Sequence, residues 1–332
     1  MASIRASGDT GIVRVARGGE DRGDAIFRGV TLAAGVLVLV VLGAIAVFLI
    51  LKGLPAIRDD QSNFFTTQTF NADISGPASY GVAGLAVGTV VTSVIALVMA
   101  VPVALGVALF VTEYAPRWLG RPLGYVSDLL AAIPSVIYGA WAALFLLPHL
   151  VGFQHFLATY FGWIPLFSDP YGEADTVTHS VLAASIVLAI MTLPIIAAIS
   201  REVFWQVDPA DREAALALGA TRWETIRMAV FPASRGGVIS AVMLGLGRAL
   251  GETIAVALVI GNNFGLFFDH HILESGGGTI ASNIANQFGE ATAAGRSALI
   301  ATGLVLFALT LLVNLIARFV MVRSGRHEAT AV

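Results

Sequence analysis

Cysteine is absent from this chain, lysine occurs once, and charged residues make up only 12% of the 332 residues. Without cysteine there are no disulfides and no thiolate metal sites. A Walker loop ends in Gly-Lys-Ser/Thr, whereas Lys52 stands between Leu51 and Gly53, so the chain is not a P-loop ATPase. The six histidines show no His-Glu-x-x-His spacing, which argues against a zinc-hydrolase site. We therefore expect no catalytic or metal site in the chain.

What the chain has in abundance is apolar sequence, with 57% hydrophobic residues and a mean hydropathy of +0.82. This composition excludes an ordinary soluble domain and predicts a polytopic membrane protein. Six apolar segments are long enough to cross about 30 Å of hydrocarbon: 29–51, 81–112, 129–148, 180–200, 236–261 and 297–318. Because backbone polar groups in lipid must be satisfied internally, these segments should be helices, giving an all-α fold.

The distribution of positive charge predicts the orientation in the membrane. Most of the 19 basic residues lie in the two terminal tails or directly after the second and fourth apolar segments. The positive-inside rule places those regions, including both termini, in the cytoplasm. Two long segments then face the outside: the aromatic stretch 149–179, expected along the outer interface, and 262–295, with a short helix predicted near 280–288.

A polar stretch from Asp208 to Pro232 interrupts the apolar pattern. Asp208 can cap a helix that Gly219 ends near position 218, and Thr221 with Glu224 has the spacing of a capping box for a second helix. We expect two short helices at about 209–230 that project from the bilayer. They either dock into a groove of a soluble partner or lie as amphipathic helices on the lipid surface.

The fifth apolar segment contains two charges, Arg248 and Glu252, four residues apart and so on one face of a continuous helix. Arg248 would lie roughly 18 Å from the cytoplasmic end, where an ionised side chain is costly unless it faces a polar cavity or a partner. Three roles remain open: mutual neutralisation that fixes the helix in its bundle, weak binding of a passing oxyanion by the guanidinium, or a gate that opens and closes.

Glycines accompany these charges. Gly247 and Gly251 form a small-xxx-small pair, and Gly245 lies beside it. Small residues at this spacing let a neighbouring helix approach closely in lipid. We predict a helix-packing surface at the depth of Arg248.

The polar stretch carries a family resemblance. The series Glu213-Ala214-Ala215, then Gly219, then Pro232 resembles the EAA loop of permease subunits in ABC importers. The resemblance implies the fold of a type I ABC importer permease, in which this loop is a coupling helix seated in a cytoplasmic ATPase. Trp223 and Ile226 are then expected among the residues that contact the ATPase.

A narrower resemblance rests on Gly245–Val256, the Glu213-Ala214-Ala215 motif and Ala281–Glu290. Together these stretches are similar to the PstC family, permease subunits of bacterial phosphate-specific ABC importers. The resemblance implies a non-enzymatic subunit in the bacterial cell membrane that transports phosphate and holds no cofactor. It implies three partners: a PstA-like permease, a dimer of a PstB-like ATPase that binds ATP and Mg, and an external PstS-like phosphate-binding protein.

The expected organisation follows from the spans and the resemblance: a cytoplasmic tail at 1–28, a first transmembrane helix and external loop at 29–80, a permease core at 81–318 and a second tail at 319–332. Two other functions remain open: a permease half for another oxyanion such as sulfate or molybdate, and a secondary carrier driven by an ion gradient. An intramembrane enzyme is disfavoured, because the spans hold no Asp, Cys or clustered His.

Overall fold

The computed structural model describes residues 22–59, 63–67, 70–71, 79–169, 172, 179–261, 272–273 and 276–325. Six helical runs are long and apolar enough to cross a membrane, which confirms the predicted all-helical class. They are Gly23–Arg58, Ala83–Tyr114, Ser135–Phe161, Val181–Trp205, Arg222–Gly251 and Ala293–Phe319. A short antiparallel pair, β1 (Phe70–Asn71) with β2 (Ser79–Tyr80), is the only strand pairing within the described ranges.

The first helix, α1 (Arg22–Asp59), belongs to two compact units, one ending at Phe48 and the other beginning at Leu49. Within the second unit, Gly53 lies against α12 (Ala293–Gly325): a Cβ at Gly53 would stand 2.9 Å from the Cα of Ala301. The end of α1 therefore joins the main bundle at a contact that tolerates no side chain.

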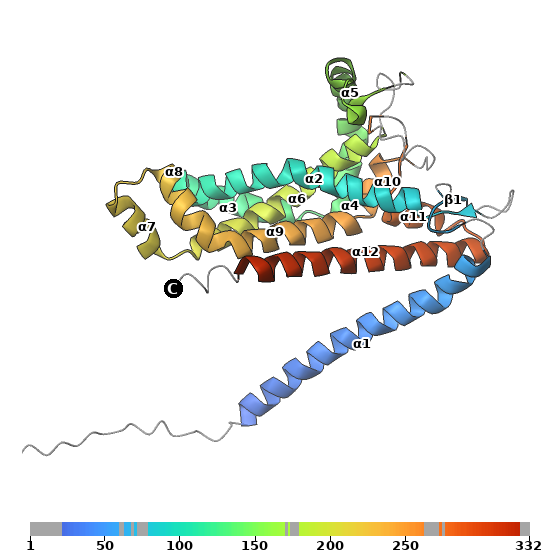
Figure 1. Cartoon of the computed structure of the whole chain (residues 1–332), viewed down its shortest axis with the longest axis horizontal. Coiled ribbons are helices and arrows are strands. Elements are labelled where there is room, and N and C mark those ends of the chain that lie inside the picture. The colour runs from blue at the N-terminus through green and yellow to red at the C-terminus, as the bar shows by residue number, and fades with distance from the viewer. Residues whose placement is uncertain are drawn as a thin grey trace, which may run out of the picture. The chain divides into compact units, whose positions relative to one another are not determined.

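Small residues build the centre of this bundle. Helix α6 (Val181–Trp205) packs along α2 (Ala83–Leu109), and α9 (Phe231–Gly251) packs against both (Figure 1). Buried alanines dominate the shared core: Ala96, Ala100, Ala104, Ala183, Ala184, Ala189, Ala197 and Ala241. In lipid the hydrophobic effect does not drive helices together, so close backbone approach over small residues supplies the packing energy.

The third span differs from its predicted bounds of 129–148. The chain forms four consecutive helical pieces here: α3 (Arg117–Ala132), α4 (Ser135–Trp141), the π-helical turn η2 (Ala142–Leu146) and α5 (Leu147–Phe161). Ile133, which precedes Pro134, is extended with a ψ of 130°, as expected of a residue before proline. The helical run that is long and apolar enough to cross a membrane extends here from Ser135 to Phe161.

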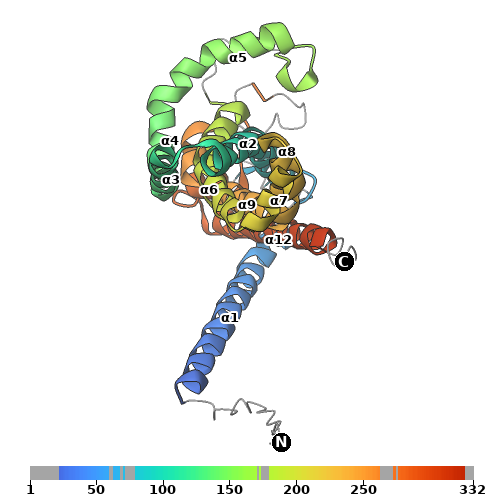
Figure 2. The same cartoon turned by 90° about the vertical axis from the view of Figure 1, so that its left-hand side faces the viewer.

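The predicted outer-interface stretch 149–179 is partly helical, since α5 extends to Phe161 and a short 3-10 turn, η3 (Pro165–Phe167), follows. Residues 170–171 and 173–178 lie outside the described part. Helix α5 diverges from the bundle (Figures 1 and 2). The helix predicted near 280–288 is confirmed as α11 (Ile280–Gln287), at the end of the bundle opposite α7 (Figure 1).

The two-helix prediction for the polar stretch is confirmed. In α7 (Pro209–Ala217) the backbone N–H of Ala210 donates to Oδ1 of Asp208 at 2.9 Å, and Gly219 ends the helix with a φ of +86°. The capping box of Thr221 and Glu224 starts α8 (Arg222–Thr225).

Beyond α8 the helix does not stop at Pro232. The π-helical turn η4 (Ile226–Val230) leads directly into α9, so the helical run continues from Arg222 to Gly251. Pro232 therefore lies inside this run, directly after η4, and local π-helical adjustments of this kind let a membrane helix accommodate a proline. We call α7, α8 and η4 together the hairpin; it forms one end of the bundle (Figure 1).

The predicted single span at 236–261 is wrong. Helix α9 ends at Gly251, Glu252 is extended with a ψ of 128°, and a separate helix, α10 (Ile254–Val259), follows. The chain therefore breaks next to the two predicted pathway charges.

Candidate functional site

Two interrupted helices meet inside the bundle. Helix α4 packs on α10, where a Cβ at Gly139 would stand 2.7 Å from the Cα of Ala255. The break at Ile133–Pro134 lies about one turn before Gly139 of α4. The break at Glu252 lies about one turn before Ala255 of α10. Irregular backbone at membrane depth is tolerated where protein buries it or where it lines a cavity, and transporters place substrate sites at such discontinuous helices.

The Glu252 side chain stabilises the start of the helix that follows it. This side chain is buried, and Oε1 accepts the backbone N–H of Ala255 at 3.3 Å, which caps α10. The expectation that Arg248 and Glu252 share one face of a continuous helix is wrong, because α9 ends between them. Two ion pairs, Arg201–Asp128 and Arg212–Glu113, involve other residues than Arg248.

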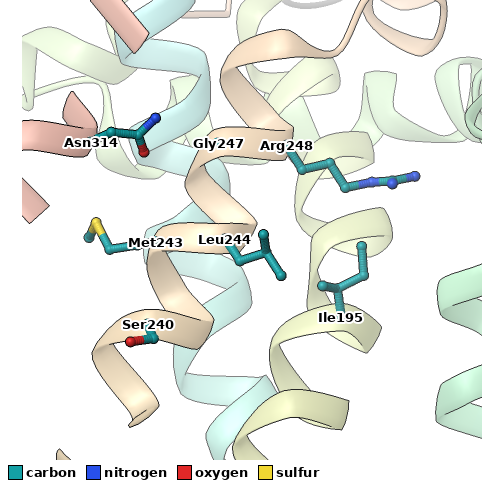
Figure 3. Close-up of a pocket in the computed structure, with 7 residues that line it drawn as sticks. All are labelled: Ile195, Ser240, Met243, Leu244, Gly247, Arg248 and Asn314. Carbon is teal, nitrogen blue, oxygen red and sulfur yellow. The ribbon is translucent and has the colours of Figure 1, made fainter. Parts of the chain in front are cut away.

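Arg248 is exposed at the end of α9, where it borders a pocket of about 560 Å³. Helices α6, α9 and α12 supply the lining: Ile195, Ser240, Met243, Leu244, Gly247, Arg248 and Asn314. Figure 3 shows the Arg248 side chain extending away from Asn314, on the side of α9 that carries Leu244 and faces Ile195. A guanidinium there presents its five N–H donors beside an open volume.

Tyr138, which the sequence reasoning missed, is the neighbour of Arg248 on the other broken helix. The two side chains are close enough to interact electrostatically. The Tyr138 hydroxyl donates to the carbonyl of Leu130 at 2.9 Å and so spans the Pro134 break. The sequence feature that could have identified Tyr138 is its position one turn after a proline in an apolar segment.

The three predicted packing glycines lie in different surroundings. A Cβ at Gly245 would stand 2.7 Å from Cδ1 of Ile196, so Gly245 allows α9 to approach α6. A Cβ at Gly247 or Gly251 would meet no described atom within 4 Å. Gly247 and Gly251 share an open strip of α9 with Leu244 and Arg248.

The predicted coupling residues of the hairpin divide into exposed and buried groups. Glu213, Ala214 and Gly219 are exposed, and 58% of Trp223 is accessible, whereas Ala215 and Ile226 are buried. Ile226 packs on Phe204 and Leu109 within the chain, so it can act on a partner only by supporting the hairpin. The sequence reasoning missed the apolar side chains that are most exposed here: Leu216, Leu218 and Met228, with Leu218 at 87%.

Comparison with solved structures shows that the chain shares its fold with chains of ABC transporters. A chain of the bacterial alginate ABC transporter, solved in complex with an alginate pentasaccharide-bound periplasmic protein, superposes with a TM-score of 0.53 at 17% identity, covering 88% of this chain and 94% of that one. A chain of the inward-facing MetNI methionine ABC transporter gives a TM-score of 0.52 at 16% identity, covering 71% and 93%. At such identities the likeness shows the fold alone.

The chain belongs to the binding-protein-dependent transport system inner membrane component family, whose model matches residues 100–323. The phosphate transport system permease protein PstC 2 of Mycobacterium bovis is 43% identical over 306 residues, covering 90% of this chain and 91% of that protein. PstC of Xylella fastidiosa is 42% identical over 316 residues, covering 94% and 95%. The chain is therefore a multi-pass membrane permease.

Proposed function

We propose that this chain is a permease subunit of an ATP-driven importer for inorganic phosphate and forms half of the translocation pathway. Relatives named as phosphate transport permeases match nearly its whole length at about 40% identity, and this observation carries the proposal. The pocket at Arg248 supports it, because a guanidinium offers two parallel donors to an oxyanion. The hydrolysis of ATP belongs to a partner.

Arg248 and Glu252 take different roles in this proposal. Arg248 contacts the passing anion, while Glu252 holds the α9–α10 break through its hydrogen bond to Ala255. An exposed cation beside an open volume binds an anion more weakly than a closed site does, because water screens it. Weak retention suits a pathway from which the anion must leave.

The partners follow from the same proposal. A second, PstA-like permease covers the open strip of α9, which no described residue covers at Gly247 and Gly251. A PstB-like ATPase dimer binds ATP and Mg and contacts the hairpin at Trp223 and Leu218, two of its exposed large side chains. A PstS-like protein delivers phosphate at the opposite end of the bundle, near α11.

The orientation completes the proposal. Both termini and the hairpin lie in the cytoplasm of a bacterial cell, as the positive-inside rule requires. Helix α12 ends on the side of the bundle where α7 lies (Figure 1). The chain contains no cysteine, so a single Leu218→Cys variant gives a clean test: an impermeant thiol reagent should label it from the cytoplasmic side only. Labelling from outside would exclude the proposed ATPase contact.

The decisive experiment reconstitutes the chain with its second permease and ATPase in proteoliposomes and adds the external binding protein. We expect uptake of labelled phosphate that requires ATP and that excess sulfate or molybdate does not inhibit. Strong inhibition by sulfate would indicate an importer for another oxyanion. Uptake by the chain alone, without ATP, would indicate a secondary carrier.

A further inference from the structure

Arg212, in α7, is hydrogen-bonded to three acceptors on two other elements. Nη1 donates to the carbonyl of Val207 at 2.6 Å, and Nη2 donates to the carbonyl of Phe204 at 2.6 Å and to Oε1 of Glu113 at 3.1 Å. Phe204 lies in the last turn of α6 and Val207 just beyond it. Arg212 therefore satisfies carbonyls that the end of α6 leaves without a helical partner.

Glu113 belongs to the π-helical turn η1 (Phe110–Tyr114), which ends the α2 run. The ion pair is largely shielded, with 21% of the Arg212 side chain and 14% of the Glu113 side chain accessible. Nη1 of Arg222 in α8 also donates to the Glu113 carbonyl, at 3.4 Å. Both helices of the hairpin are thus bonded to the same turn of α2.

An apolar cluster beneath these bonds joins the same three elements. Its buried members come from α2, from α6 and the residues just after it, and from the hairpin: Ala108, Leu109, Phe204, Val207, Ile226 and Val230. The cluster packs the hairpin against α2 and α6, but apolar contacts do not fix direction. The planar guanidinium of Arg212 does, because its donors have a fixed geometry. These bonds and contacts therefore hold the hairpin to the ends of α2 and α6 in one orientation.

Helix α6 connects this end to the pocket. Ile195 lines the pocket, and the adjacent Ile196 fills the space under Gly245 of α9. Packed interiors transmit displacement because they leave no room for side chains to absorb it. A shift of α6 thus reaches the walls around Arg248.

We propose that Arg212 is a positioning residue that transmits movement of the hairpin to α2 and α6 and through them to the Arg248 pocket. The proposal rests on the proposed function in one respect, the contact between the hairpin and an ATPase. Glu113 has a role in this proposal as well, because it accepts a hydrogen bond from Arg212 and so connects α2 to the hairpin.

The test uses a reporter in the pocket that does not depend on the transported anion. Leu244 lines the pocket and is 57% exposed, so a single Leu244→Cys variant reports pocket access by its rate of alkylation. In the assembled complex with the second permease and the ATPase, we expect trapping of nucleotide with vanadate to change this rate roughly tenfold, within the usual range of coupling between distant sites.

Adding Arg212→Lys to the reporter should reduce that change to less than about twofold, since an ammonium on a flexible stem does not fix the direction of its donors as the planar guanidinium does. The ATPase should still copurify and hydrolyse ATP. Glu113→Gln, which leaves both carbonyl bonds of Arg212 intact, should give an intermediate change. The matched control Arg235→Ala alters an exposed arginine just beyond the hairpin and should leave the response at the level of the parent.

A full response in Arg212→Lys, or no response in the parent, would overturn the proposal. So would loss of ATPase copurification in Arg212→Lys, because Arg212 would then only hold the docking surface in shape. Failure of the proposed function has a different signature: a normal nucleotide response in a parent complex that does not take up phosphate.

Discussion

The hairpin and the open strip of α9 are opposite kinds of surface, connected by the helical run Arg222–Gly251. The hairpin is complete within the chain: Asp208 and Thr221 cap its helices, Arg212 fixes it to α2 and α6, and Ile226 is buried beneath it. The strip with Gly247 and Arg248 has no such support in the described part of the chain. In the proposed function the first surface receives the ATPase as it stands, whereas the second is completed by the other permease.

The largest effect should come from Arg248 on the open strip. We expect Arg248→Ala to lower ATP-driven phosphate uptake about 100-fold or more, as for other preorganised donors to an oxyanion, with assembly and ATP hydrolysis retained. Arg248→Lys keeps the charge but loses the paired donors, so uptake should remain well below that of the parent. Full uptake with Lys would reduce the role of Arg248 to charge balance.

The hairpin should respond differently to changes in its exposed side chains and in its buried ones. Leu218→Ala and Trp223→Ala remove exposed side chains, so each should weaken ATPase binding about tenfold, equivalent to about 1.4 kcal/mol, without lowering the melting temperature. Ile226→Ala creates a cavity and should destabilise the fold by about 2–5 kcal/mol. Binding measured by titration and unfolding measured by thermal denaturation in detergent separate the two. Normal ATPase binding in both exposed variants would exclude this docking surface.

Two glycines allow the same comparison for helix packing, since one lies at a contact within the chain and the other lies on the open strip of α9. A Cβ at Gly139 meets the backbone of Ala255, so Gly139→Ala should destabilise the isolated chain by about 1–3 kcal/mol. A Cβ in Gly247→Ala meets no described atom within 4 Å, so this change should stabilise the isolated helix by up to about 1 kcal/mol, while reducing copurification of the second permease. Unchanged assembly in Gly247→Ala would show that the strip is not the permease interface.

The smallest effect is expected at Tyr138. Tyr138→Phe removes one hydrogen bond across the Pro134 break, worth about 1 kcal/mol, so uptake should slow by about fivefold while assembly is unchanged. Initial rates over a range of phosphate-loaded binding protein would separate the maximal rate from the apparent affinity. A change in assembly instead would assign Tyr138 to the fold and not to the pathway.

The parts of the fold set by neighbouring residues could be predicted from the sequence. Asp208, Gly219 and Thr221 act through bonds or dihedral angles within three residues of themselves, so the hairpin was predictable almost to the residue. Six apolar segments follow from composition in the same way, although the third and fifth helical runs differ from their predicted bounds.

Features that depend on contacts distant in sequence were not predictable. No proline marks the break at Glu252, where the burial of its carboxylate and its bond to Ala255 accompany the end of α9. Arg212 and Glu113 are 99 positions apart, so no local pattern connects them. Ile226 has the spacing of an exposed hairpin residue, and only the cluster with Phe204 shows that it is buried.

The π-helical turn η4 has a consequence for how this protein can vary. A π-helical turn accommodates one more residue than an α-helical turn, and η4 lies between the hairpin and the rest of the Arg222–Gly251 run. Deleting one residue there would convert the turn to an α-helical one, at about 100° per residue, and leave the rest of the run in nearly the same orientation. A single deletion should therefore be tolerated in this short stretch, whereas the same deletion further along the run would turn Arg248 around the helix axis.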